Sequence, residues 1–259
     1  MDVIDGNWIM RGIGWDDPKC IHSADELAAA VNEIGFLPLF SNEIEGFSVE
    51  ELTSSEHWWS GDTSVDPWEW RAILARRNDI AYGKFFNKKA GFISKKWFPY
   101  FANYRRGGYD FDARYEDGKA SHRENLIMKL FMPNECDIND VTKSTAKQLA
   151  KEFYSYEVKS LAGFGKDGEK NFEGTVTGLE MQTYLVVRDF RQKTNKRGEG
   201  YGWPIAVYTL PEYLWGYDHV TKRYSEEPET SFDKIAKCVR KHFGNTEDKD
   251  IKKVVTDSQ

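Results

Sequence analysis

The chain has 259 residues, of which 40% are hydrophobic and 15% aromatic, and this apolar content excludes global disorder. No apolar run approaches the ~20 residues of a membrane-spanning helix, and the acidic N-terminus does not resemble a signal sequence, so we expect a cytoplasmic protein without a membrane span. Cys20, Cys136 and Cys238 lie far apart, which provides no disulfide framework and suits a reducing compartment.

Charge is unevenly distributed along the chain. The net charge of −6 argues by itself against nucleic-acid binding. However, residues 1–69 hold two basic and fifteen acidic residues, whereas residues 70–107 hold ten basic residues and one acidic residue. Two interpretations stay open: the acidic segment neutralises the basic one within a single fold, or the basic segment forms a face that binds a polyanion.

Helix-capping signals organise the first 77 residues. Ser23 with Glu26 is a capping box and predicts a helix over 24–34. The apolar stretch 36–40 contains a central proline, which restricts it to an edge strand or an irregular extended segment. A second capping box at Ser48 predicts a short helix, and Asp66 followed by proline predicts another that ends near residue 77.

Strand and loop signals follow in the middle of the chain. Residues 80–86 and 90–93 are predicted to form a hairpin. Aromatic residues at helical spacing then predict an amphipathic helix over 95–106. The segment 107–118 is rich in Gly, Asp and Tyr, so we expect a loop and a module boundary there.

The second half predicts three helices and then a two-stranded ribbon, which is the order of a winged helix. The helices are expected over 121–131, 140–153 and 172–184, and the strands over 185–190 and 203–210 around a basic turn at 192–202. The predicted fold is therefore mainly α with small β hairpins (α+β), built of tandem winged-helix modules. Its expected parts are an N-terminal extension (1–22), a first module (23–107), a second module (119–215), a C-terminal helix (231–244) and a mobile tail (245–259).

Metal and cofactor signals are weak. Cys20 with His22 and Cys238 with His242 are the close Cys/His pairs, and together they would supply four zinc ligands. Nothing in the sequence brings the two pairs together, and small buried cysteines are the ordinary alternative. We therefore expect no metal and no cofactor.

Basic residues in two regions, 84–106 and 192–202, are the predicted contacts to a nucleic-acid backbone. In the first region cations alternate with aromatic residues over 95–106, and the second would form the basic tip of a wing. The alternatives are a core helix face with solvated cations and a solvated hairpin end. The predicted nucleic-acid-binding residues are Lys84, Lys88, Lys89, Lys95, Lys96, Arg105, Arg106, Lys193, Lys196 and Arg197.

Three short stretches resemble the AlkZ family of winged-helix DNA glycosylases, which remove alkylated bases and open interstrand cross-links. Phe-Leu-Pro-Leu-Phe at 36–40 is similar to the family segment that carries a Gln-x-Gln or Gln-x-Asp catalytic motif. Ala-Gly-Phe-Ile at 90–93 with Trp-Phe-Pro-Tyr at 97–100 resembles the family's aromatic, His-containing hairpin and the Trp-Pro segment after it. Tyr-Thr-Leu-Pro-Glu at 208–212 resembles its Tyr-Asp-Leu-Pro-Glu signature. The likeness implies tandem winged helices and contact with DNA.

The chain departs from this family at the catalytic positions. Pro38 and Phe40 stand where the glutamine pair should fall, and Lys88 or Lys89 replaces the hairpin histidine. Whether the chain is an enzyme is therefore left open. The catalytic candidates are Lys88, Lys89, Glu43 and Glu45, with a lysine acting as a Schiff-base nucleophile. The sequence indicates a DNA-binding winged-helix protein, and the alternative is a non-enzymatic module on the same fold that binds a protein or a small molecule.

Overall fold

The computed structural model describes residues 2–4, 7–134, 136–195 and 197–256. Its described strands fall into a small N-terminal hairpin and one larger sheet. The hairpin consists of β1 (Asp2–Ile4) and β2 (Asn7–Ile9). The sheet consists of β3 (Phe36–Pro38), β4 (Ile80–Phe86), β5 (Lys89–Ser94), β6 (Phe153–Tyr154), β7 (Val186–Thr194) and β8 (Gly200–Thr209).

The larger sheet overturns the predicted fold class. Its strand order is β3-β5-β4-β7-β8-β6 and its described pairings are antiparallel, so strands from both halves of the chain share one sheet. The prediction of a mainly helical protein of tandem winged-helix modules was therefore wrong, and the fold is α+β. The join between the halves is the pairing of β4 with β7, at Tyr82 and Val187. Two residues so far apart in sequence leave no local signal of their pairing.

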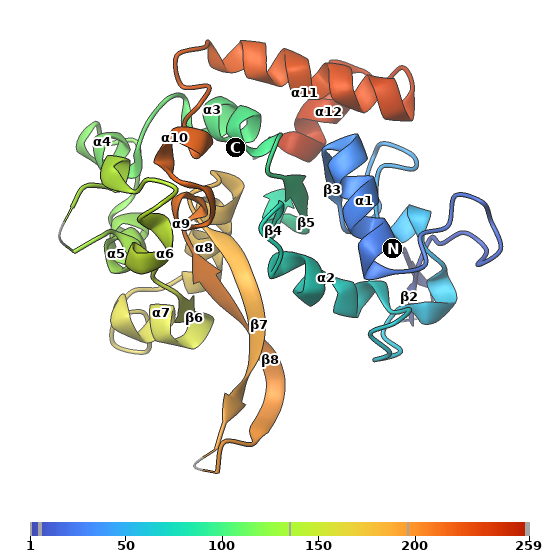
Figure 1. The fold of residues 1–259 in the computed structure, drawn as a ribbon, viewed down its shortest axis with the longest axis horizontal. Coiled ribbons are helices and arrows are strands. Elements are labelled where there is room, and N and C mark those ends of the chain that lie inside the picture. Colours follow the sequence, from blue (N-terminus) through green and yellow to red (C-terminus); the bar gives the residue numbers. More distant parts are fainter. Residues whose placement is uncertain (1, 5–6, 135, 196, 257–259) are drawn as a thin grey trace.

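Helices surround this sheet (Figure 1). The α-helices are α1 (Ala24–Ile34), α2 (Pro67–Ala75), α3 (Phe98–Arg106), α4 (Phe111–Glu116), α5 (His122–Phe131), α6 (Ala146–Leu149), α7 (Ser155–Leu161), α8 (Phe172–Met181), α9 (Pro211–Trp215), α10 (Tyr217–Val220), α11 (Pro228–Phe243) and α12 (Asp248–Val255). Short 3₁₀ turns lie at Glu50–Leu52, Ser55–His57 and Ile138–Asp140. Within the described residues, no helix combines the length and the apolar character needed to cross a bilayer.

Several local predictions are confirmed. The Ser23 side chain accepts the backbone N–H of Glu26 and begins α1, and Asp66 caps α2 ahead of its first-turn proline. β3 lies at the edge of the sheet, as expected for a strand that contains Pro38. The hairpin of β4 and β5 and helix α3 also form where the sequence predicts them, and the ribbon forms with longer strands, because β7 and β8 extend into the expected turn at 192–202.

Other local predictions differ from the structure. The expected helix over 140–153 is reduced to α6, because Phe153 and Tyr154 pair with β8 as the edge strand β6. The expected loop over 107–118 contains α4. Within the segment 245–259, expected to be a mobile tail, α12 buries Ile251, Val254 and Val255, and residues 257–259 lie outside the described part. The sequence did not predict α12 because this short helix has only three buried apolar residues, which are too few to show a helical period.

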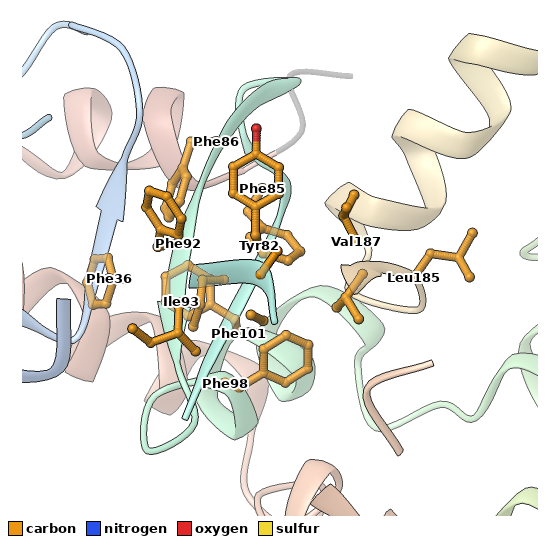
Figure 2. Packing of buried hydrophobic residues seen from close by; sticks show 14 of the residues in the cluster. Phe36, Tyr82, Phe85, Phe86, Phe92, Ile93, Phe98, Phe101, Leu185 and Val187 are labelled. Carbon is orange, nitrogen blue, oxygen red and sulfur yellow. The ribbon is translucent and has the colours of Figure 1, made fainter. Parts of the chain in front are cut away.

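Aromatic rings fill the space between the sheet and α3 (Figure 2). The Phe36 ring on β3 lies 4.8 Å from the Phe101 ring of α3, and Phe85 on β4 lies 6.2 Å from Phe98. All four side chains are fully buried. Burial of such side chains typically contributes about 1.5–3 kcal/mol each, so this aromatic layer is a major source of stability. The prediction that the aromatic face of residues 95–106 belongs to the core is confirmed.

Arg106 is the polar centre of the structure. It is 1% exposed, and its Nη1 donates to Glu212 Oε1 at 2.7 Å and to the Tyr224 hydroxyl at 3.0 Å. Its Nη2 donates to the Thr183 carbonyl at 2.6 Å, and its guanidinium lies 4.4 Å from the centre of the Tyr184 ring. One side chain thus connects α3 to the α8–β7 turn, to α9 and to the segment after α10.

Removal of the Arg106 charge should destabilise the whole fold. Arg106→Met leaves the Glu212 carboxylate buried without its cation, and loss of one partner of a buried pair typically costs about 3–5 kcal/mol. Urea denaturation should show this loss in the free energy of unfolding. The control is Arg123→Met, which breaks the exposed pair of Arg123 with Glu169 and should leave the midpoint unchanged. Equal denaturation midpoints for Arg106→Met and the unmodified chain would contradict the conclusion that Arg106 stabilises the fold.

Candidate functional site

The ribbon of β7 and β8 projects away from the body of the protein (Figure 1). Its strands are the longest in the sheet, and their outer halves lie beyond the helices. Between residues 186 and 209 the sequence has five basic and two acidic residues, against an overall charge of −6. A projecting, positively charged ribbon can contact a negatively charged partner without contact between that partner and the rest of the protein surface.

Exposed aromatic side chains lie on the outer half of the ribbon. Trp203 on β8 is 90% exposed and Tyr201 is 53% exposed. Beside the ribbon, the exposed Tyr156 of α7 stacks on Tyr154 with ring centroids 5.3 Å apart, and Lys193 Nζ lies 4.5 Å from the centre of the Tyr156 ring. Large aromatic surfaces left in water beside cations are typical of sites that stack on bases or on a partner's side chains.

A pocket of about 740 Å³ lies at the foot of the ribbon. Arg188 of β7 and Thr209 of β8 form part of its wall, and Lys95 reaches it from the turn between β5 and α3. Lys143 and Lys147, before and within α6, line its other side. Glu152 is its acidic member, and the Oε2 of Glu152 accepts Arg191 Nη2 at 2.7 Å. The pocket is therefore strongly positive.

The structure separates the predicted nucleic-acid-binding cations. Arg106 is committed to Glu212, and Arg105 donates to the backbone carbonyls of Phe85 and Val255. Lys84 is partly buried, and its Nζ donates to Thr177 Oγ1 at 3.2 Å. Each of these three side chains therefore bonds to another element of the fold.

The remaining cations lie at opposite ends of the sheet. Since β4 and β7 are antiparallel, the β4–β5 turn that carries Lys88 and Lys89 lies at the end of the sheet away from the ribbon tip. The structure brings Lys95 to the foot of the ribbon and leaves Lys96 exposed beside it. Lys193 and Arg197 lie on the ribbon itself, and Lys196 is outside the described residues. The predicted site residues did not include Lys143, Lys147, Arg188 or Trp203.

Two of the catalytic candidates lie beside a small hollow. Glu43 and Lys89 line a space of about 10 Å³ together with Pro38, Phe40 and Val254 of α12. A space of this size holds about one water molecule, so an extruded base does not fit. Glu43 Oε1 accepts Lys253 Nζ at 2.5 Å, and this hydrogen bond lowers the pKa of Glu43. The other candidates, Glu45 and Lys88, are exposed and do not line this hollow.

The cysteine and histidine pairs do not form a metal centre in the described part of the chain, where no group of three or more metal-binding side chains occurs. Cys20 and Cys238 are buried. The Cys238 thiol donates to the Ile34 carbonyl at 3.0 Å, and burial raises its pKa to about 11. Cys238 is therefore a neutral core thiol that ties α11 to the end of α1.

Glu180 of α8 is a buried carboxyl that the sequence did not reveal. Its Oε1 accepts the backbone N–H of Lys84 at 3.2 Å, just beyond the point where β4 pairs with β7. Its Oε2 is buried and has no hydrogen-bond partner among the described residues. Burial raises the pKa of Glu180 to about 7, against an opposing effect of Lys84. Glu180 thus accepts the Lys84 amide where no strand neighbour among the described residues does, and its burial favours the neutral carboxyl.

Ionisation of Glu180 should make stability depend on pH. The folded pKa of about 7 lies above the ordinary 4.5, so stability should fall as pH rises from 4.5 to 7 and then level off. The shift corresponds to about 3 kcal/mol. Urea denaturation at pH 5 and pH 8 should show this fall in the unmodified chain and a smaller one in Glu180→Gln. The same fall in both proteins would show that other groups cause it.

The comparison with known proteins identifies one family. A family model described as AlkZ related matches residues 21–256, which is nearly the whole chain. No curated protein and no solved structure shows a significant match. The matched region includes the sheet, the ribbon and the pocket at its foot. The chain therefore belongs to the AlkZ-related family.

Proposed function

We propose that this AlkZ-related protein binds DNA through the β7–β8 ribbon. The observation that carries the proposal is Trp203, which is 90% exposed on a projecting ribbon with Tyr201 beside it. Among the described residues neither Arg197 nor Lys193 has an ion-pair partner, and Lys193 Nζ lies 4.5 Å from the centre of the Tyr156 ring. Cations of this kind bind phosphates, and exposed rings stack on unpaired bases.

Stacking favours single-stranded or locally unpaired DNA over intact duplex. Bases within a duplex already stack on one another, so an aromatic side chain gains contact area mainly where a base is exposed. The ribbon carries two exposed rings but only a few free cations, so ring stacking should contribute as much as phosphate contact. The resulting binding should be largely independent of sequence, because every base has a π face.

The proposal concerns binding and assigns no base excision. The hollow beside Glu43 and Lys89 is too small for a base, and Glu43 is held by Lys253. A glycosylase needs a polar group against the sugar carbon and a pocket for the extruded base. Neither condition is supported at this position, so DNA contact is the part of the family resemblance that we retain.

Replacement of Trp203 should weaken binding to single-stranded DNA. Trp203→Ala removes one stacking platform, worth about 1–3 kcal/mol, or roughly a 5- to 150-fold rise in Kd. Fluorescence anisotropy with a labelled oligonucleotide measures this change. The matched control is Trp59→Ala, which removes another exposed tryptophan, located off the ribbon, and should leave Kd unchanged.

Salt dependence provides the second test. Replacing both Lys193 and Arg197 with glutamine should reduce the slope of log Kd against log salt by roughly 0.7 for each phosphate that the ribbon no longer neutralises. Absence of binding to single-stranded and duplex DNA at 50 mM salt would refute the proposal. A partner bound through Trp203 with an affinity that salt does not change would indicate a protein or small-molecule contact instead.

A further inference from the structure

The pocket at the foot of the ribbon contains more positive charge than the protein itself neutralises. Four of its wall residues are basic and come from three separate segments of the chain: Lys95 after β5, Lys143 and Lys147 around α6, and Arg188 on β7. Among the described residues, none of the three lysines forms an ion pair. Glu152 is the acidic residue of the wall, and its closest contact is Arg191 at 2.7 Å, whereas Arg188 is 4.0 Å away.

Arg188 is held rigidly at the base of this pocket. Its Nη1 donates to the backbone carbonyls of Ala75 at 3.1 Å and Arg77 at 3.2 Å. These bonds fix the guanidinium without removing its charge, because carbonyl groups are neutral. The pocket therefore has one immobilised positive charge at its base and flexible ammonium groups around it, an arrangement suited to enclosing an anion.

Like charges gathered in a concave space repel one another, and a bound anion relieves that repulsion. The clustering is notable because the chain carries a net charge of −6, so a random surface depression would be acidic on average. A volume of about 740 Å³ is that of a small-molecule site and is too small to hold a duplex. Leu214, Ala146 and Ala150 add an apolar part to the wall, on which a flat ring can rest.

We propose that this pocket binds a compact phosphate-bearing molecule with at least three negative charges, of the nucleoside triphosphate class. The phosphates lie among the Lys95, Lys143, Lys147 and Arg188 side chains, and the nucleoside contacts the apolar part of the wall. This site is separate from the exposed rings of the ribbon. The proposal therefore does not depend on DNA binding, and either can fail without the other.

Isothermal titration calorimetry of the full chain tests the site with ATP, inorganic tripolyphosphate and adenosine at 150 mM salt. At this salt, screening limits charge effects to about 8 Å, so distant lysines contribute little. ATP and tripolyphosphate should bind and adenosine should not. A second arm of the experiment compares a 5′-phosphorylated with a 5′-hydroxyl oligonucleotide. If the phosphorylated strand binds more tightly, and the pocket variant described below abolishes this difference, the phosphate bound in the pocket belongs to the end of a strand.

The pocket variant combines Lys143→Gln with Lys147→Gln, two exposed positions whose replacement leaves the core intact. It should weaken ATP and tripolyphosphate binding by at least tenfold. The matched control, Lys234→Gln with Lys237→Gln, removes the same charge from the exposed side of α11 and should change Kd by less than twofold. Thermal unfolding checks that both variants are folded. The proposal is overturned if no phosphate compound binds, or if both variants weaken binding equally.

Discussion

The buried ion pair of Arg106 and Glu212 links the two halves of this protein in its core, beside the strand pairing that joins them in the sheet. Arg106 ends a helix of the first half, and Glu212 follows the last strand of the second half. Arg106 also donates to the carbonyl of Thr183, whose φ of 66° is a left-handed conformation that a β-branched residue rarely adopts. Because β7 begins just after this turn, the guanidinium helps to set where the ribbon leaves the body.

The same region shows why a count of basic residues gave wrong members of the predicted nucleic-acid-binding site. In the sequence, Arg105 and Arg106 look like the ends of a cationic stripe over 95–106. In the structure both point into the protein, one toward backbone carbonyls and one toward Glu212. Glu212 is the last residue of the Tyr-Thr-Leu-Pro-Glu stretch, so at least one residue of that family signature has a structural task.

The local parts of the fold were readable from the sequence, and the long-range pairing was not. Ser23 and Asp66 indicate helix starts because their side chains accept hydrogen bonds from nearby backbone N–H groups. Pro38 indicates an edge strand because proline has no backbone N–H to donate to a neighbouring strand. The pairing of Tyr82 with Val187 depends on packing between distant segments. When this pairing is not known, the sequence of two hairpins that share one sheet looks the same as the sequence of two wings in separate modules.

The candidate site was predicted only in part, for a similar reason. The basic tip of the ribbon follows directly from its composition. The pocket does not, because Lys143 and Lys147 reach Arg188 and Lys95 only after α6 packs beside α9. The exposure of Trp203 was also hidden, since a tryptophan in a predicted strand normally suggests a core position.

The junction between β4 and β7 has a consequence for the direction in which the ribbon points. A single residue pair joins the strands there, and the ladder of β7 with β8 shifts register between Val187 and Asp189. Such an irregularity bends a strand and increases its twist. The backbone ladder therefore imposes little on the angle between ribbon and body. Side chains bridge this junction instead: the Tyr82 ring lies 5.7 Å from the Phe190 ring, and Arg76 pairs with Asp189 at 3.1 Å. Substitutions at these few positions would therefore be expected to change the inclination of the ribbon.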